Sequence, residues 1–251
     1  MTRLVRAELL KVRTTKLGYW LGLVVAVLAA LTVAGTVFGP ERDRPGFLST
    51  PEGIRAVFAS ASAGGTLAMV MGIVAMAGEW RHKTATAVFL AEPRRGRVVA
   101  AKVIAQALLG LAYGVLAALV TLLTAVICLN VKNVDYSVTA DGVPTVLVGS
   151  MLATAIYGVL GVGYGALVRN QIAAIVSGLL WTTVADGLVV TFLPTIGRWT
   201  PAGATAALTR AAAGNNRIEL LPVWAGALVL SAYGVLFAAI GVRTMVSRDV
   251  T

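Results

Sequence analysis

Six long apolar stretches, separated by short polar ones, dominate the pattern of the chain. Five of them contain no charged residue, and the sixth contains only Asp186. They are Leu17–Gly39, Ala56–Gly78, Val103–Val131, Gly142–Val168, Leu220–Val242 and, with its single charge, Asn170–Gly197. About 20 helical residues cross a hydrocarbon core of roughly 30 Å, and inside lipid the backbone must satisfy its own hydrogen bonds. The pattern therefore predicts an all-α membrane protein with six transmembrane helices.

We expect the whole chain, residues 1–251, to form a single transmembrane domain. The expected spans lie at about residues 17–39, 56–78, 103–128, 144–168, 171–193 and 221–243. Residues 79–102 would form a loop between the second and third spans, and residues 194–220 a loop between the fifth and sixth. Composition agrees with this class, since charged residues make up 13% of the chain, about half the share that is usual in soluble proteins.

The distribution of charge predicts the orientation. An even number of spans puts both termini on one side of the membrane, together with the loop at 79–102 and Arg169. That side carries fourteen Lys and Arg residues, and the other side carries seven. Because cytoplasmic loops are enriched in Lys and Arg, both termini are expected in the cytoplasm. The net charge of +10 is thus explained by the membrane, and no nucleic-acid partner is expected.

Residues 1–16 form a basic segment that can wind as a short helix. Leu9 lies on an apolar stripe, with the cations Arg6, Lys11 and Arg13 around it. This pattern is typical of an interfacial helix lying on the inner leaflet, with its cations near anionic headgroups of the membrane lipids. The same cations would also serve as a plain topology signal.

The loop at residues 194–220 has the signals of a further helix. Thr200 is suited to cap it, Pro201 to occupy its first position, and Gly214 with Asn215 to end it. We expect a helix of about three turns along the outer surface. It would either contact a substrate or gate, or pack over the ends of the spans.

Four glycine pairs are spaced for close helix contacts. They are Gly18/Gly22, Gly35/Gly39, Gly110/Gly114 and Gly161/Gly165. Such pairs let helices approach closely in lipid. We expect most of these contacts within one chain, and contacts in a dimer at one or two of the pairs.

The chain lacks the residue patterns of common enzymes. None of its five lysines follows a glycine, so it contains no phosphate-binding G-x-x-x-x-G-K-[ST] loop. A single His and a single Cys are too few for a zinc site of the usual ligands, and the H-E-x-x-H and G-x-S-x-G motifs are absent. We therefore expect no catalytic, metal or cofactor-binding residue in this chain.

Asp186, in "LLWTTVADGLVV", is the one ionisable residue well inside an expected span. A charge at this depth costs several kcal/mol unless it is paired or hydrated, so it is a functional candidate. It could bind an ion or a proton. The alternative is an Asp that fastens two helices by hydrogen bonds.

The stretch "GEWRHKTATAVFLAEPRRGR", residues 78–97, interrupts the apolar pattern in the first half of the chain. Its candidate site residues are Glu79, Arg81, His82, Lys83, Thr84, Thr86, Phe89, Arg94, Arg95 and Arg97. These cations could simply hold the topology and attract anionic lipid. The order of a polar pair, a Thr-rich short helix, Pro93 and a basic corner also suits a short helix that docks a soluble partner.

"GEWRHKTATAVFLAEPRRGRVVAAK" resembles the loop between the second and third spans of ABC-2-type transporter permeases. In that family the pattern is G-E-[aromatic]-R-x-x-T, a short segment, a Pro-Arg-Arg corner and Ala-Lys. "AELLKVRTTK" is similar to the start of these permeases, and "PTIGRWTPAGATAALT" to their segment after the fifth span. Asp186 stands where they more often carry Glu. The resemblance covers the whole chain in the number of spans, their orientation and the length of the chain, and the order of the motifs along the chain is that of the family.

This resemblance implies a permease without its own ATPase, in a bacterial inner membrane. It would pair with a second permease subunit, identical or related, and with two copies of an ABC ATPase subunit that hold ATP and magnesium. Residues 81–90 would form the coupling helix, and the N-terminal segment the elbow helix. Glu79 and Arg81 would brace the loop, an ion pair between them being one arrangement. The cargo would be an amphiphile, such as a drug, a peptide antibiotic or a lipid, moved outward.

Two other classes of function stay open at this point. One is a self-contained secondary transporter or channel that uses Asp186. The other is a membrane scaffold or sensor that transports nothing and recruits a partner through its basic loop.

Overall fold

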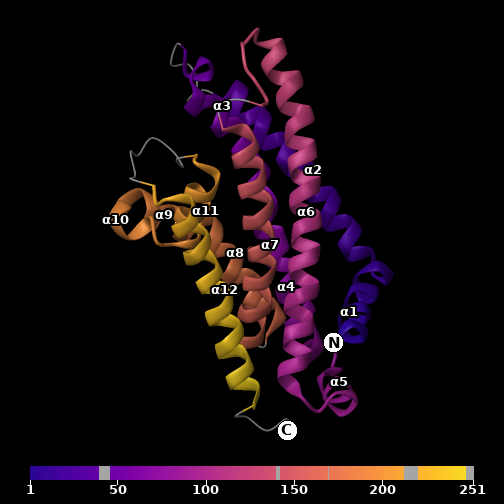
Figure 1. Cartoon of the computed structure of the whole chain (residues 1–251). Helices are drawn as coiled ribbons and strands as arrows, with labels where there is room; N and C mark the ends of the chain where they lie inside the picture. Colours follow the sequence, from indigo (N-terminus) through magenta and orange to yellow (C-terminus); the bar gives the residue numbers. More distant parts are fainter. Residues whose placement is uncertain (40–45, 140–141, 169, 212–219, 247–251) are drawn as a thin grey trace.

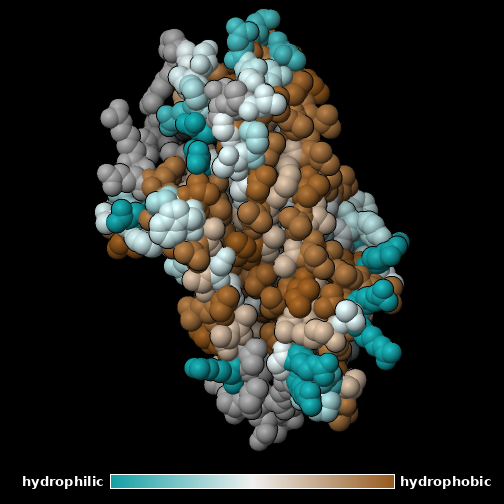
Figure 2. All heavy atoms as spheres, viewed as in Figure 1, coloured by the Kyte–Doolittle hydropathy of each residue, from teal (hydrophilic) through white to brown (hydrophobic). Residues whose placement is uncertain are grey.

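The computed structural model describes residues 1–39, 46–139, 142–168, 170–211 and 220–246. Within these ranges every regular element is a helix. Six helical segments in these ranges are long and apolar enough to cross a membrane, which confirms the expected all-helical class with six candidate spans. The long helices run side by side (Figure 1), and apolar residues cover the middle of the molecule between more hydrophilic ends (Figure 2).

The helices follow each other along the chain with short connections. The first half contains α1 (Thr2–Thr14), α2 (Lys16–Phe38), η2 (Phe47–Ser49), α3 (Pro51–Phe58), η3 (Ala59–Ala63), α4 (Gly64–Arg81) and α5 (Ala85–Ala91). The second half contains α6 (Arg95–Val131), α7 (Val143–Val168), α8 (Gln171–Leu180), η4 (Trp181–Ala185), α9 (Asp186–Phe192), α10 (Pro194–Gly197), α11 (Pro201–Thr209) and α12 (Val223–Val246). The second span combines α3, η3 and α4, and the fifth combines α8, η4 and α9.

The helix of the third span is much longer than a membrane requires. α6 has 37 residues, which corresponds to about 55 Å at 1.5 Å per residue, against a hydrocarbon core of roughly 30 Å. It begins at Arg95, where the sequence pattern placed the start of the span near residue 103. The expected loop at 79–102 is therefore mostly helical, and the only non-helical parts of it are residues 82–84 and 92–94.

α7 lies at the centre of the bundle, and its glycines let the neighbouring helices pack directly against its backbone. A Cβ at Gly161 would collide with the backbone of α4, and one at Gly158 with the backbone of α6. The same holds for Gly149 against α11 and for Gly163 against α12. α7 therefore contacts four neighbours at backbone distance, on different sides of one helix.

Three of the four glycine pairs make contacts within the chain. Gly110 and Gly114 of α6 face α7, Gly161 and Gly165 of α7 face α4, and Gly18 and Gly22 of α2 lie near Tyr113 of α6. The exception is Gly35/Gly39, because a Cβ at Gly35 would meet no described atom within 4 Å.

α11 begins as the sequence predicts, but it does not lie on the surface. The Thr200 hydroxyl accepts a hydrogen bond from the Gly203 amide at 3.4 Å, as expected of the capping residue. The helix ends earlier than predicted, at Thr209, and is followed by Arg210 with φ 48°. Gly214 and Asn215, the predicted stop, lie outside the described residues. Its small side chains let it enter the core beside α7 and α12, where Leu208 is 2% exposed.

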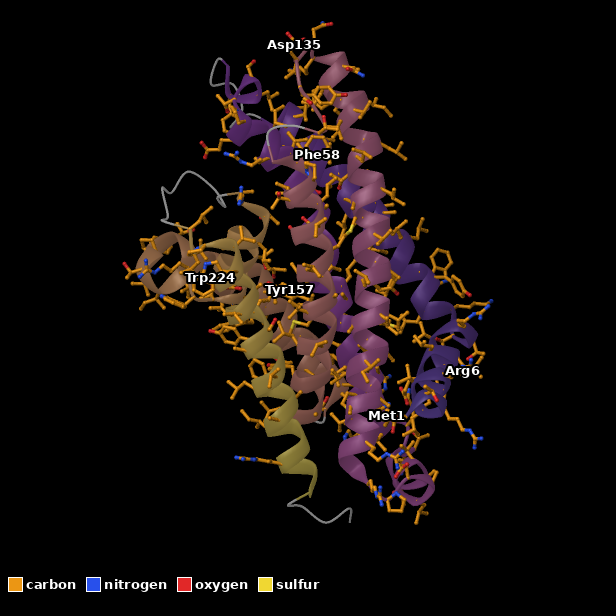
Figure 3. The ribbon with its side chains drawn as sticks, viewed as in Figure 1. Met1, Arg6, Phe58, Asp135, Tyr157 and Trp224 are labelled. Atoms are coloured by element: carbon orange, nitrogen blue, oxygen red, sulfur yellow. The ribbon has the colours of Figure 1, made fainter. Side chains whose placement is uncertain are left out.

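One end of the bundle brings together segments that are far apart in the sequence. The N-terminus, α5 and the last turns of α12 lie at the lower end in Figure 1. Met1 and Arg6 are in the lower part of Figure 3, whereas Asp135 marks the opposite end.

Candidate functional site

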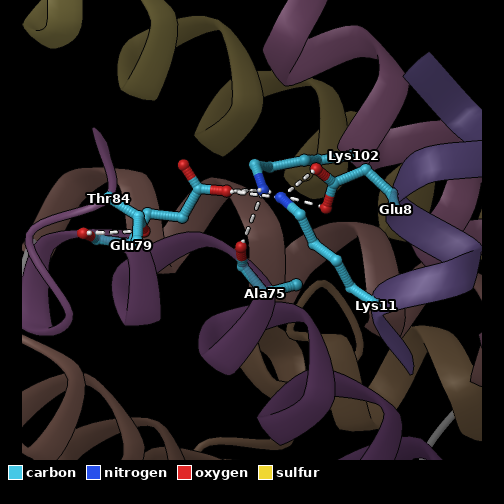
Figure 4. A network of polar contacts seen from close by, with 6 residues as sticks. All are labelled: Glu8, Lys11, Ala75, Glu79, Thr84 and Lys102. Carbon is cyan, nitrogen blue, oxygen red and sulfur yellow. Dashed lines mark hydrogen bonds and ion pairs between the residues drawn. The ribbon is translucent and has the colours of Figure 1, made fainter. Parts of the chain in front are cut away.

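Four charged side chains from three helices meet near the end of the bundle that carries α5 (Figure 4). The ammonium of Lys102 on α6 donates to Glu8 Oε2 at 2.9 Å, to Glu79 Oε1 at 2.6 Å and to the Ala75 carbonyl at 3.0 Å. Lys11 donates to Glu8 Oε1 at 2.8 Å and to Glu79 Oε1 at 3.0 Å. We call Glu8, Lys11, Glu79 and Lys102 the charged network.

Helix periodicity places the groups that α1 contributes to the charged network on one face of α1, and those that α4 contributes on one face of α4. Glu8 and Lys11 are three residues apart on α1, and Ala75 and Glu79 are four apart on α4, so each pair lies on one side of its helix. The Lys102 side chain stands between these two sides and is only 1% exposed. The network therefore joins α1, α4 and α6.

The charged network is electrically neutral, and its ammonium groups donate hydrogen bonds to its carboxylates. Two ammonium groups face two carboxylates. All three donors of the Lys102 ammonium have acceptors, which offsets the desolvation of a buried cation. Removal of one member would leave an uncompensated charge in the interior, so the four residues act as one unit.

Lys11 stays positively charged in this environment. Burial lowers the pKa of its ammonium, but the hydrogen bonds and charges of Glu8 and Glu79 outweigh burial and raise the pKa above its ordinary value. Lys11 is also half-exposed, with 51% of its side chain accessible. It is thus the member of the network that can still meet another group.

An ion pair between Glu79 and Arg81 was one expected arrangement, and it was wrong. Glu79 pairs with Lys11 and Lys102, and Arg81 is exposed at the end of α4. Residues two apart on a helix point to different faces, which explains why the two side chains do not meet. Glu8 and Lys102 were missed as site residues, although an acid within a basic segment and a Lys at the start of an apolar run are unusual enough to notice.

Only three residues, 82–84, connect the end of α4 to the start of α5. Lys83, with φ 56°, makes the turn, and the Thr84 amide donates to the Glu79 carbonyl at 3.0 Å. The Thr84 hydroxyl donates to the same carbonyl at 3.4 Å. The backbone of Glu79 therefore holds the start of α5 while its carboxylate belongs to the charged network.

α5 and the three residues before it, 82–84, carry several exposed side chains. Leu90 is 79% exposed, and His82, Lys83, Thr84 and Thr86 are exposed as well. Phe89 and Arg95 lie in described helices, but their side chains are outside the described part of the structure. The structure thus brings the candidate loop residues to one end of the bundle, around a short helix with an exposed leucine.

The basic corner closes the turn between α5 and α6. Arg97 lies 3.3 Å from Glu92 Oε2, an ion pair across the turn. Arg94 is exposed just before α6. One of the three predicted arginines therefore has a structural partner within the loop.

α1 has the two-sided character that the sequence predicts. Glu8 is buried, Leu9 is half-buried, and Arg6 and Arg13 are exposed. The helix packs against α6 and α2. Its buried side carries the network, and its exposed side carries the remaining cations.

Asp186 fastens the fifth span to α11. It is fully buried, and its Oδ2 accepts a hydrogen bond from the Ala202 amide at 2.8 Å, in the first turn of α11. Its Oδ1 is buried without a hydrogen-bond partner among the described residues. The π-helical turn Trp181–Ala185 comes immediately before Asp186. One extra residue in a turn rotates the following side chains by roughly 100°, so this turn helps to decide where Asp186 points.

A groove of about 780 Å³ lies beside the charged network, between α1, α4 and α5. Lys11, Glu79 and His82 supply polar groups to it, whereas Val74 and Val88 are among its apolar walls. We call it the α1–α4–α5 groove. Among the described residues, no group of three or more His, Cys, Asp or Glu side chains could hold a metal ion.

Comparison with known proteins adds no relative. No family model matches the chain, and no curated protein matches it in sequence. Its function must therefore be argued from its own residues and their geometry.

Proposed function

We propose that this chain is the membrane-spanning permease subunit of an ABC-2-type exporter. A separate ATPase would dock on residues 79–97 and supply the energy. The observation that carries this proposal is the position of α5, a short helix with an exposed Leu90 that stands at the end of the bundle and is tied to α4 through Glu79. The order of motifs in this loop, which resembles that of ABC-2-type permeases, supports the same conclusion.

The contacts around Glu79 provide a route for mechanical coupling. A push on α5 would reach α4 through the three residues 82–84 and the hydrogen bonds from Thr84 to Glu79. The charged network would pass the displacement from α4 to α1 and α6, because its ion pairs join all three helices. The spans would then move together when the ATPase changes shape.

In this proposal the complete transporter contains two permease subunits and two ATPase subunits, with ATP and magnesium bound by the ATPases. Both termini and α5 face the cytoplasm of a bacterial cell, as the excess of Lys and Arg on that side favours. The cargo is an amphiphile, such as a drug, a peptide antibiotic or a lipid, which moves outward.

The contacts of Asp186 support a fastening role in this transporter. Its hydrogen bond to the backbone of α11 holds two elements of the chain together. A secondary transporter that uses Asp186 would instead lose transport in Asp186→Asn and would work without any ATPase.

The test is a pull-down of the tagged chain from native membranes, compared with Leu90→Asp and with residues 85–91 scrambled. We expect a P-loop ATPase to come down with the intact chain and to be lost with both variants. Val131→Asp is the matched control, because Val131 is also an exposed apolar residue, 66% accessible, at the opposite end of α6. Absence of an ATPase from the intact chain, or equal recovery with the scrambled segment, would overturn the proposal and leave the transporter and scaffold alternatives.

A further inference from the structure

The α1–α4–α5 groove has the size and lining of a ligand site. Its volume of about 780 Å³ lies within the range of roughly 300–1,000 Å³ that is usual for small-molecule sites. Apolar side chains line most of it, namely Val12, Leu17, Met71, Val74, Ala87, Val88 and Ala91. Polar groups join them, including Lys11, Thr15, His82 and Gln106. A molecule that fits must therefore be both apolar and polar.

The groove lies where the first span begins and the second ends. Leu17 is in the first turn of α2, and Glu79 is in the last turns of α4. In a membrane this is the depth at which hydrocarbon meets headgroups. The amphiphile always present at this depth is a phospholipid of the adjoining leaflet.

The charge of the surroundings selects an anionic headgroup. Residues 1–16 carry five basic side chains and one acidic one, a net charge of four positive. Both carboxylates that line the groove already accept hydrogen bonds from lysines of the network. Lys11 uses two of the three donors of its ammonium in the network and is half-exposed. A phosphate oxygen can accept its third donor.

We propose that the α1–α4–α5 groove binds an anionic phospholipid of the adjoining leaflet, the inner one in the orientation proposed above. The acyl chain lies along Val74 and Val88, and the phosphate meets Lys11. Because α5 forms one wall of the groove, the bound lipid supports α5 in its position beside α4. Binding of the lipid does not require an ATPase, so this proposal can fail or hold independently of the exporter.

The test uses the full chain in vesicles of phosphatidylcholine with a minor fraction of phosphatidylglycerol. Photoactivatable analogues of the two lipids are cross-linked in separate samples, and the labelled peptides are identified by mass spectrometry. We expect the phosphatidylglycerol analogue to label peptides of α1, α4 and α5 more strongly than the phosphatidylcholine analogue. We expect Ala91→Trp to fill the groove and lower this labelling several-fold. Leu90→Trp, on the neighbouring residue that does not line the groove, should leave it unchanged.

A second pair of variants tests the charge. Lys11→Gln should reduce the preference for phosphatidylglycerol about fivefold, the effect of one cation near an anionic surface. Lys132→Gln, which removes an exposed lysine at the opposite end of α6, should retain the preference. If Lys11→Gln does not fold, the comparison of lipid labelling in Ala91→Trp and Leu90→Trp still tests whether the groove binds the lipid. The proposal is overturned if the two lipids label the groove equally, or if Ala91→Trp leaves the labelling unchanged.

Discussion

The Lys102 ammonium lies 2.6 Å from Oε1 of Glu79, and this ion pair joins the third span to the last turns of the second. The same ammonium lies 2.9 Å from Glu8, so it also holds the N-terminal helix. Glu79 in turn holds the start of α5 through its carbonyl oxygen. A single buried lysine therefore stands at the centre of the contacts between α1, α4, α5 and α6.

Replacement of Lys102 by Met should strongly destabilise the protein. The variant keeps a side chain of similar length but leaves Glu8 and Glu79 with Lys11 alone. Breaking a buried ion pair costs about 3–5 kcal/mol, because the remaining charge stays in the interior without compensation. We expect a fall of this size in the free energy of unfolding, measured with denaturant in detergent micelles.

Lys132→Met is the control for this variant. Lys132 is exposed, and its ammonium lies 5.2 Å from the centre of the Phe38 ring. Loss of an exposed cation should change the free energy of unfolding by less than about 1 kcal/mol. Equal losses in the two variants would contradict the role given to Lys102.

Glu8→Gln should release α1 from the bundle. Glu8 accepts hydrogen bonds from both Lys11 and Lys102, and a neutral amide holds two cations less well than a carboxylate. Amide hydrogen exchange should therefore become faster in residues 2–14 than in the intact chain, with little change in α7. Arg6→Gln alters an exposed residue of the same helix, and amide hydrogen exchange in residues 2–14 should not change in this variant. Faster exchange in both variants would indicate that α1 frays whether or not the charged network is intact.

Asp186→Leu and Asp186→Asn should behave differently. Leu cannot accept the hydrogen bond from the Ala202 amide, and an unsatisfied buried donor costs about 1–3 kcal/mol. Asn retains an acceptor of the same shape. We expect lower thermal stability in Asp186→Leu. In the exporter that we propose, Asp186→Asn should retain assembly and nucleotide-dependent transport. Loss of transport in a stable Asp186→Asn would favour a role in carrying an ion or a proton.

Gly161→Ala should disturb the contact between α7 and α4. A Cβ at this position would collide with the carbonyl group of Met69, so the two helices must separate. Overpacking of this kind costs about 1–3 kcal/mol. Gly35→Ala adds the same methyl group where no described atom lies within 4 Å, and it should leave the melting temperature in detergent unchanged or slightly higher. A similar loss in both variants would mean that helix flexibility, rather than close contact, explains the effect.

Much of the architecture follows from local sequence. Six apolar stretches of span length predict six membrane-crossing helices, because the bilayer leaves the backbone few alternatives. The start of α11 at Thr200 and Pro201 follows from their capping chemistry. A short helix between the second and third spans was expected at about residues 81–90, and α5 occupies Ala85–Ala91.

The partners of the charged residues could not be predicted from local sequence. Glu8 and Lys102 are 94 positions apart, and Lys11 and Glu79 are 68 apart. Periodicity places a side chain on a face of its own helix, but it does not say which helix covers that face. The resemblance to ABC-2-type permeases offered Arg81 as one partner for Glu79, whereas the packing of α1 and α4 against α6 brings Lys11 and Lys102 to it.

By itself, the sequence determined the class of the protein, the number of its spans and the ends of several helices, because these depend on hydrophobicity and capping over short distances. Tertiary structure alone decided that α11 is buried, that Asp186 meets Ala202 after a π-helical turn, and that Lys102 is enclosed by two acids. α11 is buried where small residues let helices approach closely, as at Gly149 of α7 and Gly226 of α12, and the other two contacts join side chains or backbone of different elements. Such contacts depend on the shape of two surfaces at once, which no single stretch of the chain contains.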